Sequence, residues 1–161
     1  MDKIKKRALV LVDVQNVYYT SRQAFKRNFD YNQFWAQLAA TKEIVHAFAY
    51  AIDRGDQKQR EFQNILRAIG FEVKLKPFIQ RSDGSAKGDW DVGIAVDAML
   101  HAPLVDEVVL VSGDGDFDIL VDTIQSKFGK PVSVYGVEAL TADSLISVAN
   151  EFVRIEQELL L

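Results

Sequence analysis

The chain has 161 residues, of which 48% are hydrophobic and 26% charged, and these proportions are ordinary for a globular protein with one core. It contains no cysteine, which excludes disulfides, zinc–thiolate sites and cysteine nucleophiles. No apolar run approaches the roughly 18 residues that a membrane span requires. The charge of Asp13 also comes too early for a signal peptide. We therefore expect a cytoplasmic protein with a single domain over residues 1–161.

The formal net charge of the chain is −4, whereas proteins that coat nucleic-acid phosphates are usually basic. Four of the negative charges belong to Asp13, Asp91, Asp114 and Asp116. If a cation gathers these four carboxylates, the remainder of the molecule is close to neutral. The net charge therefore does not exclude a nucleic-acid substrate.

Short apolar runs rich in β-branched residues alternate with segments in which apolar residues recur at helical spacing. In chain order the predicted elements are a strand at 8–12, helices at 16–25 and 31–40, a strand at 43–52, a helix at 62–69, a strand at 71–78, a helix at 92–99, a strand at 108–112, a helix at 117–128, a strand at 131–135 and a helix at 142–152. This alternation predicts an α/β layered domain with a mostly parallel sheet.

Aspartates follow two of the predicted strands at the point where each strand ends. Asp13 follows the first strand, and Asp114 and Asp116 follow the fourth. In open α/β sheets, ligands bind at the carboxyl ends of the strands where the strand order reverses. If the first and fourth strands are neighbours, these aspartates face each other, and Asp91 joins them from the start of its helix. Converging carboxylates need a counter-charge, and Mg²⁺ or Mn²⁺ prefers oxygen ligands.

A simpler role is open to each of these aspartates, because an aspartate that follows a strand is often the N-cap of the next helix. Asp13 fits a cap as well as a metal ligand, and Asp114 or Asp116 could cap the helix that begins near Phe117. However, three aspartates in the five residues from Asp114 exceed what a cap requires.

Two further aspartates are expected to point elsewhere. Asp97 lies six residues after Asp91, which places it about 120° away around a helix. Asp118 faces away from Asp114 once the helix has begun.

The chain has only two histidines and no cysteine, so a zinc site is not expected.

Four segments, in this order along the chain, resemble the successive motifs of NYN domains, the LabA-like branch of the PIN-like nuclease superfamily. They are Leu11-Val-Asp-Val-Gln-Asn16, Lys87-Gly-Asp-Trp-Asp-Val-Gly-Ile-Ala-Val-Asp97, Val109-Leu-Val-Ser-Gly-Asp-Gly-Asp-Phe117 and Gly129-Lys-Pro-Val-Ser-Val-Tyr-Gly136. The resemblance covers residues 8–155. It implies a Rossmann-like three-layer α/β/α sandwich with a mostly parallel sheet, and RNA cleavage at an acidic metal site.

The resemblance also implies roles for particular residues. It assigns the catalytic, metal-holding positions to Asp13, Asp91, Asp114 and Asp116, and Asn16 matches the asparagine that accompanies the first aspartate. The chain departs from the commoner family pattern at one point.

That departure concerns the spacing after Lys87. Asp91 lies four residues after this lysine, where three is commoner in the family, so Asp89 could share or take the role of Asp91.

The working hypothesis is a ribonuclease that uses Mg²⁺ or Mn²⁺ to activate water and to neutralise charge on the phosphate. Asn16 and Ser112 would then hydrogen-bond a substrate oxygen, and Lys87 would reach the phosphate or remain a solvated loop lysine. Three aromatic residues are candidates for stacking on RNA bases or for packing in the core: Tyr18, Tyr19 and Trp90.

Other functions remain open at the level of the sequence. A non-catalytic RNA-binding or regulatory protein-interaction module could keep the acidic site without cleaving anything. A magnesium-dependent phosphatase would place a second aspartate two residues after Asp13, and Gln15 stands there instead. The RNA substrate, the number of metals and the oligomeric state are not specified, and a homodimer or a protein partner is compatible with so small a domain.

Overall fold

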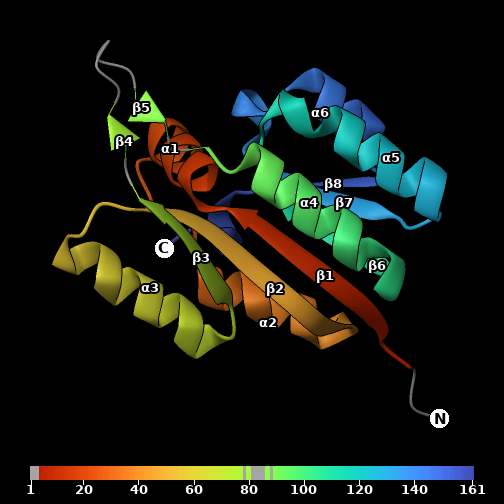
Figure 1. Ribbon diagram of the computed structural model, residues 1–161, viewed down its shortest axis with the longest axis horizontal. Helices are drawn as coiled ribbons and strands as arrows, with labels where there is room; N and C mark the ends of the chain where they lie inside the picture. The colour runs from red at the N-terminus through yellow and green to blue at the C-terminus, as the bar shows by residue number, and fades with distance from the viewer. Residues whose placement is uncertain (1–3, 78, 81–85, 88) are drawn as a thin grey trace.

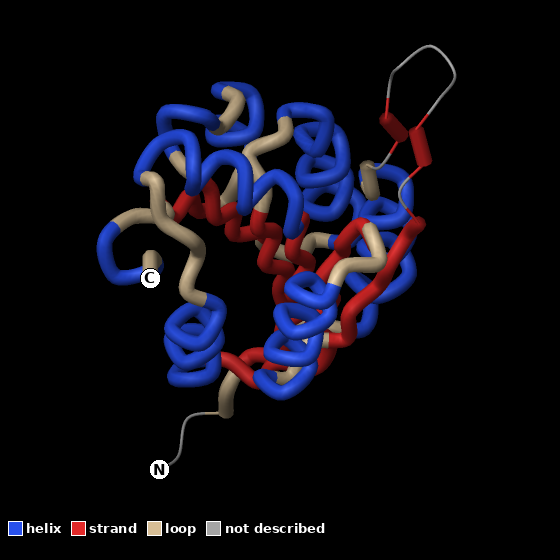
Figure 2. Tube along the Cα trace, turned by 90° about the vertical axis from the view of Figure 1, so that its left-hand side faces the viewer, coloured by secondary structure: helices blue, strands red, loops and turns tan. Residues whose placement is uncertain are grey.

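The computed structural model describes residues 4–77, 79–80, 86–87 and 89–161, with side chains described for 4–77 and 89–161. A sheet of six strands forms the middle layer, and helices cover both of its faces (Figure 1). A view turned by 90° shows the strands lying between helices (Figure 2). The expected α/β/α sandwich is therefore confirmed.

The six-stranded sheet is parallel throughout. Its strands are β1 (Lys6–Asp13), β2 (Lys42–Asp53), β3 (Glu72–Pro77), β6 (Glu107–Val111), β7 (Val132–Gly136) and β8 (Glu151–Arg154). Their order is β3-β2-β1-β6-β7-β8, and every neighbouring pair is parallel. Two further short strands, β4 (Ile79–Gln80) and β5 (Ala86–Lys87), pair antiparallel with each other beyond the end of β3.

The connections between strands are mostly helical. The helices are α1 (Val14–Phe25), α2 (Tyr31–Thr41), α3 (Gln57–Ile69), α4 (Asp91–His101), α5 (Asp118–Phe128) and α6 (Asp143–Val148). Four 3₁₀ turns are η1 (Ala102–Leu104), η2 (Gly115–Phe117), η3 (Glu138–Leu140) and η4 (Gln157–Leu159). Within the described ranges, none of the helices has the length and apolar character needed to cross a membrane.

The central strand β1 is apolar on both faces because a helical layer covers each of them. Val10 and Val12 belong to the core that α1, α2 and α3 form with one face of the sheet. Leu9 and Leu11 belong to the core that α4, α5 and α6 form with the other face. All four side chains are 0% exposed, which explains why the sequence shows a continuous apolar run instead of an alternating one.

The C-terminal part differs from the expectation. A helix over 142–152 was predicted, but α6 ends at Val148, and β8 follows as the edge strand beside β7. Phe152 and Val153 explain the difference, because they pack into the cores on opposite faces of the sheet, as successive residues of a strand do. Leu159 and Leu160 then fold back under α2 and are 4% and 5% exposed.

Candidate metal centre

The two aspartate-bearing segments meet because β1 and β6 are neighbours in the sheet. The chain first builds outward from β1 to β3 and then crosses to β6 on the other side of β1, so the strand order reverses between them. Val12 pairs in register with Val111, and both strands end at the same edge. This arrangement puts Asp13 beside Ser112 and the loop that leads to Asp116, as a switch point requires.

Asp13 caps α1 and also anchors the segment that follows β6. Its Oδ1 accepts a hydrogen bond from the backbone N–H of Asn16 at 3.4 Å, and its Oδ2 accepts one from the hydroxyl of Ser112 at 3.2 Å. Asn16 in turn accepts, through its side-chain oxygen, the backbone N–H of Gly113 at 2.8 Å. The sequence left two roles open for Asp13, that of a helix cap and that of a site residue. The two roles are compatible, because its two carboxylate oxygens face different partners.

The network continues along the loop after β6. The hydroxyl of Ser112 accepts the backbone N–H of Asp114 at 3.2 Å, and Oδ1 of Asp114 accepts the backbone N–H of Asp116 at 2.9 Å. The second hydrogen bond caps the short turn η2. These bonds fix the backbone of the loop, so that the carboxylates of Asp114 and Asp116 are held on one side of it.

Asp91, at the start of α4, completes a group of three carboxylates. Within the described part of the chain, one carboxylate oxygen from each of Asp91, Asp114 and Asp116 lies within 4.8 Å of the other two. Asp91 and Asp114 are half-buried, and Asp116 is exposed. Of the four aspartates predicted to hold a metal, three form this group, and Asp13 lies next to it through Ser112.

The position of Asp91 depends on how α4 is held against the sheet. Asp91 is the first residue of α4, and Asp97 is on the same helix. Oδ2 of Asp97 accepts hydrogen bonds from the hydroxyl of Tyr50 at 2.8 Å and from Nζ of Lys74 at 2.7 Å. Just before the helix, Nε1 of Trp90 donates to the carbonyl oxygen of Ala51 at 2.9 Å. Asp97 thus acts as an anchor for α4 and is not a member of the acidic group.

The electrostatics of the group are unfavourable without a cation. Burial raises the pKa of Asp13 to about 6, with smaller contributions from the charges of Asp114 and Asp89. Burial also raises the pKa of Asp91 to about 7, followed by the charge of Asp114, the charge of Asp89 and a hydrogen bond with Asp114. No described basic side chain forms an ion pair with Asp91, Asp114 or Asp116.

The donor set fits a hard divalent cation. Oxygens around Mg²⁺ lie about 2.1 Å from the ion, so ligands on the same octahedron are about 3 to 4 Å apart. The 4.8 Å limit within which the three oxygens lie is close to this span and needs only small side-chain rotations. A cation would also remove the repulsion that raises the pKa of Asp91.

Comparison with known proteins adds the decisive observation, since the family model of the NYN domain matches residues 7–156. The chain belongs to the NYN domain family. Low amplitude and bright protein LabA of Synechococcus elongatus is 27% identical over 155 residues, which cover 91% of this chain and 82% of that protein. A crystal structure of a protein of unknown function from Vibrio parahaemolyticus is 58% identical, with a TM-score of 0.94, covering 100% of this chain and 99% of that one.

The fold of this NYN domain does not by itself indicate a reaction. The structure of ribokinase from Giardia lamblia is 13% identical with a TM-score of 0.50, covering 94% of this chain and 58% of that one. That likeness shows a shared layered fold alone. The function must therefore be argued from the site.

Three further residues of the NYN domain that were candidates from the sequence lie next to the acidic group and outside it: Ser112, Asn16 and Asp89. Ser112 is 1% exposed, and its hydroxyl hydrogen-bonds both Asp13 and Asp114, so this side chain makes its contacts within the protein. Asn16 is half-buried and holds Gly113. Asp89 is exposed and close enough to raise the pKa of Asp91, but the group within 4.8 Å contains Asp91 and not Asp89.

Four other sequence candidates can also be located. Lys87 is the last residue of β5, and its side chain lies outside the described residues. Asp118 is the first residue of α5 and is not in the acidic group. Trp90 packs against Tyr50, with ring centroids 5.3 Å apart, whereas Tyr18 is 53% exposed.

A close backbone crossing behind the loop was not predicted from the sequence. The hydroxyl of Thr141 is buried and donates to the carbonyl oxygen of Val137 at 2.7 Å. A Cβ added at Gly136 would lie 2.5 Å from this Oγ1, and one added at Gly113 would lie 2.9 Å from the carbonyl oxygen of Leu140. The two glycines therefore let the loop after β6 lie directly on the segment after β7.

We expect Gly136→Ala to destabilise the protein by about 2 kcal/mol, because Thr141 is fixed by its own hydrogen bond and cannot move aside. Thr141→Ala should cost about 1 kcal/mol through the lost hydrogen bond. The double variant should lose less than the sum of the two, since the second change removes the clashing atom. Urea unfolding of all three measures this, and strict additivity would show that the crossing is not the cause.

Proposed function

We propose that this NYN domain is a metal-dependent ribonuclease that hydrolyses phosphodiester bonds of RNA at the acidic centre. The observation that carries the proposal is the convergence of Asp91, Asp114 and Asp116, whose carboxylate oxygens lie within 4.8 Å of one another at the switch point of the sheet. Membership of the NYN family supports it.

In this proposal, the three carboxylates of Asp91, Asp114 and Asp116 hold Mg²⁺ or Mn²⁺. A divalent cation bound there would promote attack of water on the phosphorus and offset negative charge on the phosphate oxygens. Asp116 is the exposed member of the group, so an RNA strand would approach from its side. Lys87, directly before the segment that carries Asp91, is proposed to contact a phosphate.

The two polar residues beneath the group have a supporting role in this proposal. Ser112 and Asn16 link α1 to the loop after β6 through Asp13 and Gly113. They would keep the carboxylates from moving apart when RNA binds. We therefore assign Asp13 to both functions, as a carboxylate adjoining the cation and as the cap that fixes α1.

A cleavage assay tests the proposal. Single-stranded and structured RNAs are incubated with the protein in Mn²⁺, in Mg²⁺ and in EDTA, and cleavage is expected in one or both metals and not in EDTA. Calorimetry should detect binding of the same metal to the protein alone. RNA binding without cleavage in either metal would instead favour a non-catalytic RNA-binding or regulatory module, and failure to bind any divalent metal would remove the basis for the centre.

A further inference from the structure

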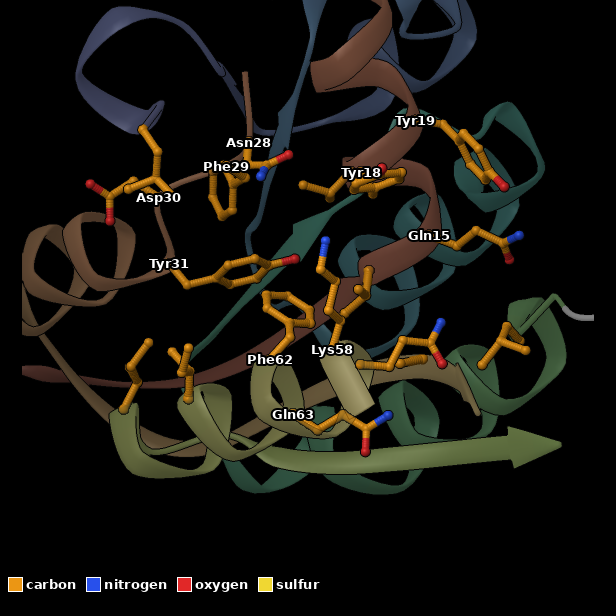
Figure 3. Close-up of a pocket in the computed structure, with 18 of the residues that line it drawn as sticks. Gln15, Tyr18, Tyr19, Asn28, Phe29, Asp30, Tyr31, Lys58, Phe62 and Gln63 are labelled. Atoms are coloured by element: carbon orange, nitrogen blue, oxygen red, sulfur yellow. The ribbon is translucent and has the colours of Figure 1, made fainter. Parts of the chain in front are cut away.

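A hollow opens beside the acidic centre, on the other side of α1. It has a volume of about 660 Å³ and lies between α1, the start of α2, the end of β2 and α3 (Figure 3). This volume falls in the range of pockets that bind small organic groups. Val14, directly after Asp13, lines the hollow, while Asn16 on the opposite side of α1 contacts the loop of the metal centre. One helix therefore separates the two sites.

Two largely buried residues with polar side chains line this hollow. Tyr31 is 8% exposed and Gln63 is 5% exposed, and neither side chain has a hydrogen bond to any described residue. In the close-up view, the hydroxyl of Tyr31 points into the middle of the hollow (Figure 3). The fully buried and unpaired polar atoms of the described side chains belong to other residues, so the polar groups of Tyr31 and Gln63 are accessible to solvent. They are therefore free to meet a ligand in the hollow that offers both donors and acceptors.

The rest of the lining is aromatic and electrically balanced. Phe62 lies against Tyr31, with ring centroids 5.6 Å apart, and Tyr18 covers the hollow from α1 (Figure 3). Tyr18 is 53% exposed, so its side chain is accessible to a stacking partner. The charged lining residues are two basic and two acidic ones: Arg54, Lys58, Asp30 and Asp56. Balanced charge and aromatic walls suit a flat uncharged ring better than a phosphate.

The negative charge of Asp13 links the hollow to the metal centre. The pKa of Tyr31 is raised mainly by burial and to a smaller extent by the charge of Asp13, so the tyrosine lies within electrostatic reach of that carboxylate. A nucleotide chain with one phosphate at the acidic group could therefore place a neighbouring base on the far side of α1. In Figure 3 the amino group of Lys58 also points into the hollow, where it can meet a phosphate at the rim.

We propose that the hollow between α1 and α3 is a nucleobase pocket for the single-stranded RNA that the metal centre acts on. This inference rests on the proposed function, because it gives the RNA strand a second contact with the protein beside the bond that is cleaved. Tyr18 and Phe62 stack on the base, and Tyr31 and Gln63 hydrogen-bond its edge. The pocket thus gives the domain a means of selecting which nucleotide lies beside the scissile phosphate.

Binding measurements without metal test the pocket separately from catalysis. The probes are fluorescein-labelled eight-nucleotide homopolymers of the four RNA bases, in EDTA, with the four nucleoside 5′-monophosphates as competitors. We expect one base to bind more tightly than the others. Tyr18→Ala should weaken that binding by about 5-fold to 150-fold, the range for loss of a base-stacking aromatic ring.

Two further variants test the polar contacts. Tyr31→Phe and Gln63→Leu should each weaken binding of the preferred base by about 2-fold to 12-fold, the effect of one hydrogen bond. Neither should lower the melting temperature, because neither removes a hydrogen bond within the described protein. Tyr135→Phe, a matched change of a buried tyrosine that does not line the pocket, should leave affinity unchanged.

The outcomes separate this inference from the nuclease proposal. Base-selective binding that Tyr18→Ala and Tyr31→Phe weaken supports the pocket even if no metal produces cleavage. Conversely, cleavage accompanied by equal binding of all variants overturns the pocket and leaves the nuclease proposal standing. Absence of any detectable binding to the homopolymers and monophosphates also overturns it.

Discussion

Replacing Asp114 with asparagine is expected to lower metal-dependent cleavage of RNA at least about 100-fold while the fold stays intact. Asp114 is the central member of the acidic group, because it caps the turn at Asp116 and one of its carboxylate oxygens lies within 4.8 Å of one from Asp91. Asparagine keeps a carbonyl oxygen for the N–H of Asp116 but removes the negative charge that a cation requires. The result is therefore loss of function without loss of the loop.

The matched control is Asp122→Asn, which makes the same chemical change at an exposed position on α5. It should cleave like the wild type. Circular dichroism and the melting temperature show whether Asp114→Asn is folded, and added Mn²⁺ should raise the melting temperature of the wild type but not of this variant. If Asp114→Asn and the wild type cleave equally well, the activity does not come from this centre, and a contaminating nuclease becomes the explanation.

The layout of the sheet could be predicted from the sequence, because its signals are local. Buried parallel strands leave apolar runs, and Asp13 and Asp114 mark the ends of two of them. That these ends would meet depended only on the reversal of strand order, which the observed sheet contains. The edge strand β8 was not predicted, because the segment up to Phe152 also fits a continued helical pattern.

The contacts that hold the site in place could not be predicted from the sequence. Asp97 was expected to lie on a different helix face from Asp91, but its partners, Tyr50 and Lys74, come from β2 and β3 and could not be named from the sequence. Similarly, nothing in the local sequence around Tyr31 and Gln63 indicates that both residues line one hollow. Such features arise when elements distant in the chain pack together, so they need the three-dimensional structure.

These anchors have a common consequence for how the acidic group is maintained. Asp91 and Asp114 repel each other, yet α4 is tied to the sheet through Asp97 and the loop is tied to α1 through Ser112. The fold therefore keeps the carboxylates close against their mutual repulsion. Proteins commonly give up some folding stability at a site where binding or catalysis requires such an arrangement.

The stability of the metal-free protein should consequently depend on pH in a defined direction. The carboxyl group of Asp13 keeps its proton up to about pH 6 in the folded state, whereas an unfolded aspartate loses it near about pH 4. The folded state thus binds more protons between these values, and the free energy of unfolding falls as the pH rises from about 4 to 6. Asp91, with a pKa of about 7, extends the fall toward neutrality.

We expect Asp13→Asn to stabilise the metal-free protein by up to about 3 kcal/mol at pH 7.5, the free energy that corresponds to a rise in pKa from about 4 to about 6. Asparagine can still accept the N–H of Asn16 and can donate to the hydroxyl oxygen of Ser112, so the network is kept with one bond reversed. Most of the gain should disappear by about pH 4, where the carboxyl group of the wild type is protonated in the folded state and about half protonated in the unfolded state.

Urea unfolding of both proteins in EDTA, from pH 4 to 8, measures this difference. His101 acts in the opposite direction, because burial and then the charge of His46 lower its pKa, so its contribution is lost as the pH falls below about 6.5. That contribution is common to both proteins and cancels in the comparison. A gain that stays constant across the whole pH range would mean that Asp13 carries no buried-charge penalty, and a loss of stability at pH 7.5 would mean that its hydrogen bonds outweigh that penalty.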